Sequence, residues 1–427
     1  MRLPLELVEA IVEHLGDDLS ALKSCSTASS VFLPSSQRHL FSTLTLSPPR
    51  PAKGSIGQPA SSTTEKALQL FSLSPHLTKY IHTIFLENAG EMATTAQGQR
   101  NYWLTLDAHF PALISLIPAV RSFVWENGMC GLNWFSLPVE TRQAMHSAFG
   151  RWPLVRFEVS TVVNFPLSLV RSMKSLAHLG FSQAHFVLDE AGPCTGSSEL
   201  EGGMVVRQEE RLLSLKTISL AEPSRHLLSA LVSWLLENAD VSGLESLSWN
   251  TYYGYFAKGE DMMELQRLLQ QASSSIRTLH VAPTLDSTSV SLAPSLALPP
   301  QDYTELRTLT MGFEFSQHNP SSFHWLKNSL ENVVLRDNSN LETVQFRCHL
   351  AQGDPLAEFD ENAWCSIRDT LLSASAELKL SSLQDVSVEV YAVYSEAEEK
   401  MEGVLERIRE VLGPLEKRVS LRVTRFS

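Results

Sequence analysis

One short segment of the sequence has the residue types of a catalytic centre. Gly192-Pro193-Cys194-Thr195-Gly196 has the outline of a nucleophile elbow in which cysteine takes the place of the nucleophile. Such a turn needs a strand directly before it and a helix directly after it. Here Asp189-Glu190-Ala191 precedes the segment and Ser197-Ser198 follows it, within a stretch of small and polar residues. The sequence therefore does not favour an enzyme, and Cys194 stays as the one catalytic alternative.

Phosphate-binding and metal-binding patterns are absent from the sequence. It has no Gly-x-Gly-x-x-Gly, no Gly-Lys-Ser/Thr, no His-Glu-x-x-His and no EF-hand loop. The cysteines are odd in number and have neither zinc-ligand nor disulfide-framework spacing: Cys25, Cys130, Cys194, Cys348 and Cys365. We therefore predict no metal and no cofactor.

The composition argues against nucleic acid and membrane as partners. The 427 residues are 43% hydrophobic, which is enough for a large core. The 34 basic and 47 acidic residues give a formal net charge of −13, so the chain repels nucleic acid. No apolar run approaches the length of about 18 residues that a membrane helix needs. Glu6, Glu9 and Glu13 lie where a secretory signal would be apolar, so we expect a cytoplasmic or nuclear protein with no membrane partner.

Residues 1–46 have the pattern of short amphipathic helices. Leu7, Val8, Ile11, Val12 and Leu15 recur at helical spacing and form one apolar stripe. After Gly16-Asp17-Asp18, a second and a third helical segment follow, with apolar positions at Leu19, Leu22, Cys25, Phe32, Leu33, Leu40 and Phe41.

This segment resembles a known interaction module. The residues that carry the resemblance are Leu3-Pro4-Leu5-Glu6-Leu7, Ile11, Leu15, Asp18-Leu19, Leu22, Cys25-Ser26, Leu33-Pro34-Ser35-Ser36 and His39-Leu40-Phe41. They are similar to an F-box, and most similar to the F-boxes of a large fungal group whose remaining sequence is a degenerate leucine-rich array. The sequence departs from that group at Ser29-Ser30-Val31-Phe32, where a Cys/Ser-Arg/Lys-x-Trp stretch is usual.

The resemblance implies a substrate-recognition subunit of an SCF (Skp-cullin-F-box) ubiquitin ligase. Its partners would be the Skp adaptor, a cullin reached through that adaptor, and a protein substrate that the sequence does not identify. The expected adaptor-binding residues are Leu3, Pro4, Leu7, Ile11, Leu15, Leu19, Leu22 and Phe32. The alternative is a non-catalytic repeat scaffold, in which the N-terminal helices only cap the array.

Behind the helical segment, one spacing of apolar residues returns eleven times. It has the form apolar-x-x-apolar-x-apolar, and the matches are Phe41-Leu44-Leu46, Ile81-Ile84-Leu86, Val120-Phe123-Trp125, Leu154-Phe157-Val159, Leu176-Leu179-Phe181, Leu215-Ile218-Leu220, Leu244-Leu247-Trp249, Ile276-Leu279-Val281, Leu306-Leu309-Met311, Leu341-Val344-Phe346 and Leu383-Val386-Val388. The residue before the second apolar position is polar in every match, which indicates strands with one buried face and one wet face.

Helical patterns lie between several of these strands, for example at 227–236, 262–269, 364–372 and 401–412. One strand and one helix per about 20–40 residues is typical of a leucine-rich solenoid. The predicted fold class is therefore α/β: a three-helix F-box, then an irregular leucine-rich-repeat-like solenoid with parallel strands inside and helices outside. An ordinary α/β sheet domain is the alternative.

Stretches rich in proline, serine and glycine set the domain limits. We predict a helical domain at 1–46, a linker or loop at 47–64 and the array at 65–427. Two further stretches, near 189–203 and 282–300, are predicted to be loop insertions within the array.

The wet strand face is the expected substrate surface, since solenoids bind partners on the concave sheet. Phe85, Val124 and Arg156 are the candidate anchors, because an apolar or guanidinium group stands out on a face of small polar residues. A phosphorylated substrate would need clustered arginines. Arg156 and Arg347 lie on distant strands, so we do not expect such a site.

Overall fold

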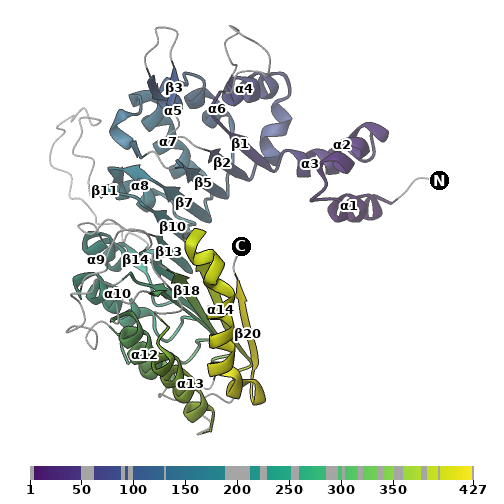
Figure 1. Cartoon of the computed structure of the whole chain (residues 1–427). Coiled ribbons are helices and arrows are strands. Elements are labelled where there is room, and N and C mark those ends of the chain that lie inside the picture. Colours follow the sequence, from purple (N-terminus) through teal and green to yellow (C-terminus); the bar gives the residue numbers. More distant parts are fainter. Residues whose placement is uncertain are drawn as a thin grey trace, which may run out of the picture. The chain divides into compact units, whose positions relative to one another are not determined.

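The computed structural model describes residues 4–49, 62–87, 92–94, 100–128, 131–187, 212–221, 228–251, 259–284, 297–300, 303–315, 321–334, 340–350, 359–376, 382–392 and 395–425. The chain forms two compact units, Met1–Leu213 and Ser214–Ser427. Each unit is α/β, with parallel strands and helices (Figure 1). The predicted loop at 189–203, the segment around Cys194, residues 285–296 of the loop at 282–300, and Leu3 lie outside the described residues.

Three helices open the first unit: α1 (Leu5–His14), α2 (Leu19–Ala28) and α3 (Leu33–Leu40). The Asp18 side chain caps α2, since its Oδ1 accepts hydrogen bonds from the backbone N–H groups of Ser20 and Ala21, both at 2.9 Å. Helices α1 and α2 both contact α3. Their shared core is small and consists of Val8, Val12 and Leu22, which have no exposed surface.

The five main strands of the first unit are parallel and follow one another in chain order. They are β1 (Thr43–Leu46), β2 (Thr83–Glu87), β5 (Ser122–Glu126), β7 (Arg156–Ser160) and β10 (His178–Ser182). Because β1 pairs with β2, the last residues of the segment 1–46 belong to the sheet, and the first unit joins the helices and this sheet. The first of the two compact units ends at Leu213, and the domain limits expected around 47–64 stay a prediction.

Shorter elements link these strands. The helical ones are α4 (Thr63–Leu73), η1 (Pro75–Tyr80), α5 (Trp103–Leu106), α6 (Phe110–Leu116), η2 (Trp134–Ser136), α7 (Val139–Arg151) and α8 (Leu167–Ser172). The short strands are β3 (Met92–Thr94), β4 (Arg100–Tyr102), β6 (Leu132–Asn133), β8 (Val162–Val163), β9 (Phe165–Pro166) and β11 (Phe186–Val187), which pair as β3 with β4, β6 with β8 and β9 with β11.

Aromatic side chains fill the core between this sheet and its helices. Phe123 lies 5.0 Å from Phe149 of α7 and 5.9 Å from Phe157 of the next strand, measured between ring centroids. Helices α4, α6, α7 and α8 contact one another in chain order, as the strands do (Figure 1). Each strand–helix step therefore buries its apolar face against its neighbours, which is how stacked repeats form a continuous core.

The two ends of the proline-rich segment after β1 are hydrogen-bonded to each other. Thr63 Oγ1 accepts a hydrogen bond from the Ser47 backbone N–H at 2.9 Å and donates one to the Ser47 carbonyl at 3.0 Å. The two ends of the segment therefore meet within the first unit; residues 50–61 lie outside the part of the chain that the structure describes.

The second unit repeats the strand arrangement. Its seven main strands are parallel and again follow chain order: β13 (Thr217–Ala221), β15 (Ser246–Asn250), β16 (Thr278–Ala282), β17 (Thr308–Phe315), β18 (Thr343–Leu350), β19 (Asp385–Ala392) and β20 (Ser420–Arg425). The helices are α9 (Leu228–Asn238), α10 (Gly259–Ala272), α12 (Ser321–Val334), α13 (Glu361–Ala376), α14 (Ser395–Leu412) and η4 (Gly413–Lys417). Two short strands, β12 (Leu213–Ser214) and β14 (Ala239–Asp240), complete the described elements.

The predicted strand pattern is confirmed at all eleven matches, and the four predicted helical stretches lie within α9, α10, α13 and α14 or overlap them. The polar position before the second apolar residue is in register from strand to strand: Thr43, Thr83, Ser122, Arg156 and His178 in the first unit, and Thr217, Ser246, Thr278, Thr308, Thr343 and Asp385 in the second. Sequential parallel order is compatible with a solenoid-like arrangement.

The described residues contain neither a candidate membrane-spanning helix nor a candidate metal site. No helix among them is both long and apolar enough to pass through a bilayer. Likewise, no group of three or more His, Cys, Asp or Glu side chains in the described ranges could hold a metal ion.

Candidate functional site

The most prominent candidate is a group of exposed apolar side chains on the first three helices and in the turn between α2 and α3. We call it the N-terminal apolar set; its members are Leu5, Leu7, Ile11, Leu19, Val31 and Leu33. Leu7 is 52% exposed and Ile11, four residues later, is 43% exposed, so they lie on one side of α1. The adjacent side, about 100° around the helix, carries the buried pair Val8 and Val12.

Helix α1 is therefore apolar on two sides, one packed and one open. Full burial of a leucine or isoleucine side chain is worth about 1.5–3 kcal/mol relative to exposure. A contiguous exposed apolar patch on a folded chain is typical of a surface that a partner covers.

The expected adaptor-binding residues differ in how exposed they are. Pro4, Leu7, Ile11 and Leu19 are exposed. Leu15 and Phe32 are half-buried, and Leu3 lies outside the described residues. Leu22 has no exposed surface, so it belongs to the core of the three helices and cannot touch a partner without unpacking them. Its helical spacing placed it on the apolar side of α2, and that side faces α3.

Three exposed members of the set escaped the sequence analysis as docking residues. Leu5 lies inside the Leu-Pro-x-Glu-Leu start, and Val31 and Leu33 flank Phe32. The one sequence signal that could have identified Leu5, Val31 and Leu33 is that each lies next to a predicted adaptor-binding residue or within two positions of one. Spacing on one helix could not reveal these three, because exposure here depends on how α3 packs against α1 and α2.

A second candidate is the polar face of the first-unit sheet, where the three predicted substrate anchors lie. Phe85 and Val124 are register partners on β2 and β5, and both are half-buried. Arg156 lies on β7 in register with Ser122, two residues before Glu158, which is the register partner of Val124. The structure thus brings Phe85 and Val124 together and leaves Arg156 beside them.

The charge of Arg156 is already neutralised within the sheet. Its Nε and Nη2 atoms both lie 2.8 Å from Oε1 of Glu158, two residues along the same strand. Gly180 of β10 makes room for this arrangement, since a Cβ atom there would lie 2.8 Å from Glu158 Cγ. Arg156 is therefore a poor anchor for an anionic ligand unless Glu158 moves.

The second-unit sheet has its own cluster of titratable groups on the polar face. Ser248 Oγ lies 3.1 Å from His280 Nδ1, and the Arg347 Nε donates to Glu389 Oε2 at 3.2 Å. Tyr391 Oη also donates to that carboxylate oxygen at 3.2 Å, and its ring stacks on His349 at 4.6 Å.

These contacts keep both histidines neutral. Burial, followed by the charge of Arg347 and a smaller electrostatic contribution from His349, lowers the pKa of His280 to about 4. Burial and Arg347 lower the pKa of His349 to about 4. Burial is also the main reason why the pKa of Tyr391 rises to about 12. Since Arg347 pairs with Glu389 and Arg156 with Glu158, neither arginine is set up as a phosphate site.

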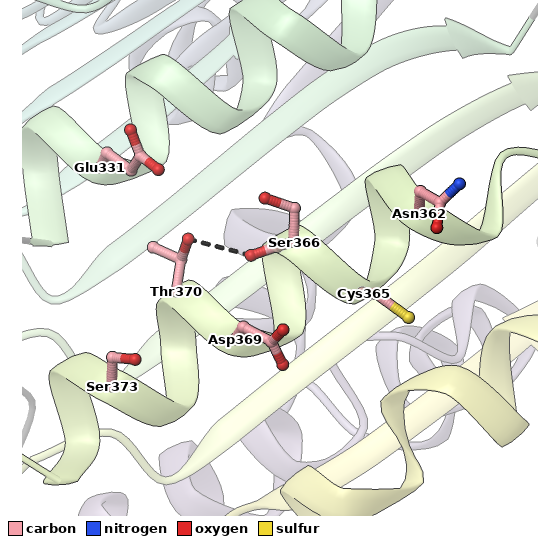
Figure 2. Close-up of a pocket in the computed structure, with 7 residues that line it drawn as sticks. All are labelled: Glu331, Asn362, Cys365, Ser366, Asp369, Thr370 and Ser373. Carbon is pink, nitrogen blue, oxygen red and sulfur yellow. Dashed lines mark hydrogen bonds between the residues drawn. The ribbon is translucent and has the colours of Figure 1, made fainter.

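A third feature lies on the helical side of the second unit. A pocket of about 440 Å³ opens between α12 and α13 and is lined by Glu331, Asn362, Cys365, Ser366, Asp369, Thr370 and Ser373. Figure 2 shows these side chains spread along the two helices, with Thr370 hydrogen-bonded to the Ser366 carbonyl. They do not converge on one point, so the pocket lacks the geometry of a nucleophile with its base.

Comparison with known proteins adds no relative: no protein-family model, no curated protein and no solved structure matches this chain.

Proposed function

We propose that the chain is the substrate-binding subunit of an SCF ubiquitin ligase. In this proposal the N-terminal helices bind the Skp adaptor, the adaptor links the chain to a cullin, and the repeat-like sheets hold a protein substrate. The resemblance of residues 3–41 to an F-box suggests the partner. One structural observation supports it: six of the fifteen large apolar side chains that are exposed among the described residues lie on these three helices or in the turn between α2 and α3.

The proposed mechanism involves no covalent chemistry on this chain. A receptor that holds a substrate beside a charged conjugating enzyme raises the effective concentration of the substrate lysines. The chain then needs two binding surfaces and no nucleophile. The N-terminal apolar set and the polar sheet face of the first unit provide two such surfaces.

Co-expression with the Skp adaptor tests the proposal. We expect the two proteins to elute from a sizing column as one species at a one-to-one ratio. Ile11→Asp should abolish the complex, because it places a charge in the middle of the apolar contact. The matched control is Leu73→Asp, which changes an equally apolar and 84% exposed residue of α4, outside the set.

Either of two results would contradict adaptor binding. One is a wild-type chain that elutes apart from the adaptor. The other is a complex that Ile11→Asp and Leu73→Asp weaken equally, since the contact would then lie elsewhere or be non-specific.

One observation favours the alternative of a capping role. Helix α3 runs directly into β1, and the Ser42 carbonyl accepts hydrogen bonds from the backbone N–H groups of His82 and Thr83, at 2.9 and 3.0 Å. The helices thus adjoin the first strand, as a cap would. A pure cap predicts that Ile11→Asp leaves every interaction of the chain unchanged.

A further inference from the structure

The polar face of the first-unit sheet carries an apolar pair next to a pair of like charges. Phe85 and Val124 are neighbours across β2 and β5. Two residues further along the same strands, Glu87 and Glu126 are also register partners. Side chains two apart point to the same side of a strand, so all four share this face.

The two glutamates occupy directly opposite positions on neighbouring strands. Neighbouring strands are about 4.8 Å apart, so the two carboxylates start from adjacent positions. Neither forms an ion pair in the described part of the chain, whereas Glu158 in the neighbouring row is paired with Arg156. Glu126 is exposed and Glu87 half-exposed.

This arrangement costs stability when nothing is bound. Like charges directly opposite one another on neighbouring strands are destabilising. A half-exposed phenylalanine beside them adds apolar surface that water covers. Both costs would be relieved by the same ligand, one that brings a positive charge to the glutamates and an apolar group to Phe85 and Val124.

We infer that this face binds an extended basic peptide segment in which a Lys or Arg lies two positions from a large apolar residue. Phe85 and Glu87 are two residues apart, about 6.6 Å along the strand, and residues i and i+2 of an extended peptide have the same separation. The apolar side chain packs on Phe85 and Val124 while the cation lies between Glu87 and Glu126.

The inference deepens the proposed function, since the bound segment would belong to the substrate. Only the identification of the bound peptide as part of a ligase substrate rests on the proposed function. The contacts on the sheet face hold whether or not the N-terminal helices bind an adaptor.

Selection from a phage-displayed library of random decapeptides tests the inference on the full chain. We expect the enriched peptides to contain Lys or Arg two positions from Leu, Ile, Val, Met or Phe. A fluorescein-labelled copy of the most enriched peptide should bind at least tenfold more weakly to the Glu87→Gln/Glu126→Gln variant. Its affinity for the wild type should also fall as salt is raised.

Glu140→Gln is the matched control, because Glu140 is an exposed carboxylate of α7, outside the sheet. The control should bind the peptide as the wild type does. Phe85→Ser, with both glutamates retained, should also weaken binding. The glutamine variants keep the shape of each side chain, and a thermal melt no lower than that of the wild type establishes that they fold.

The inference is overturned if no peptide is enriched, if the enriched peptides lack a basic residue, or if the double glutamine variant binds as tightly as the wild type. Adaptor co-elution, measured on the same preparations, separates the two proposals. Peptide binding without adaptor binding would leave the sheet-face inference standing and remove the ligase role. Adaptor binding without peptide binding would support the ligase role and overturn the sheet-face inference.

Discussion

At the scale of single residues, His280 and His349 couple the second unit to pH. Both are neutral in the folded chain because burial and Arg347 oppose a second positive charge there. Their pKa of about 4 lies below the value of 6.5 for an exposed histidine. A depressed pKa in the folded state means that the unfolded chain binds protons first as the pH falls. The stability contribution is therefore complete above pH 6.5 and is lost progressively from there down to pH 4.

Acidification below pH 6.5 should accordingly destabilise the second unit. At pH 5, the linkage of each histidine costs up to about 2 kcal/mol relative to pH 7.5. His280→Gln removes one of the two titrating groups, so the variant should lose less stability over this range than the wild type. Urea unfolding at pH 7.5, 6 and 5, followed by tryptophan fluorescence, measures the difference. Equal pH dependence in wild type and variant would mean that His280 does not titrate between these states.

A second residue-scale prediction concerns the like-charge pair on the first-unit sheet. Because Glu87 and Glu126 repel each other across β2 and β5, Glu87→Gln/Glu126→Gln should stabilise the unliganded chain by about 0.2–1 kcal/mol. The same urea experiment at low salt measures this gain, and added salt should shrink it. Glu140→Gln should change the unfolding midpoint little, since that residue has no paired carboxylate on a neighbouring strand. A destabilised double variant would show that the glutamates support the sheet.

At the scale of elements, the sequence predicted most of the long strands, but it did not predict the last long strand or the short strand pairs. A strand with one buried face has a period of two, and this pattern located all eleven expected strands and their common register. The twelfth strand, β20, escaped because Arg418 occupies the position where the other matches have an apolar residue. The short pairs, such as β6 with β8, were also missed, since two-residue strands carry no periodicity.

The site could be predicted only where exposure follows from one element. The shared exposure of Leu7 and Ile11 could be predicted because their spacing puts them on one side of α1; their contact with an adaptor stays a prediction. Leu22 was misplaced because an apolar helix side can face either a partner or a neighbouring helix, and periodicity is the same in both cases. The carboxylate pair on β2 and β5 was not recognised as a site, because its significance depends on the register between two strands.

Leu22 and Leu7 should respond in opposite ways to truncation. Leu22→Ala opens a cavity in a three-residue core and should cost about 2–5 kcal/mol, enough to loosen α1–α3. Leu7→Ala removes exposed surface and should leave helix stability nearly unchanged while weakening adaptor binding. Hydrogen exchange over residues 5–40 measures the first effect, and co-elution with the adaptor measures the second. Equal protection in the two variants would contradict the packing described here.

At the scale of the whole molecule, exposed apolar side chains are unevenly distributed along the chain. Of the fifteen large apolar side chains that are exposed among the described residues, six lie between Leu5 and Leu33. The chain also carries a formal charge of −13, which limits self-association elsewhere on its surface. Together these features predict a chain that associates through its N-terminal helices when no partner covers them.

Dye binding by the chain alone should reveal this property. We expect the isolated full chain to bind 8-anilinonaphthalene-1-sulfonate and to form concentration-dependent oligomers, and the adaptor complex to do neither. Leu7→Gln/Ile11→Gln should lower the dye signal of the isolated chain, whereas Leu70→Gln/Leu73→Gln, two exposed leucines of α4, should lower it much less. If both double variants behave alike, the exposed surface is spread over the molecule. The N-terminal helices would then be better explained as a cap on β1 than as a docking module.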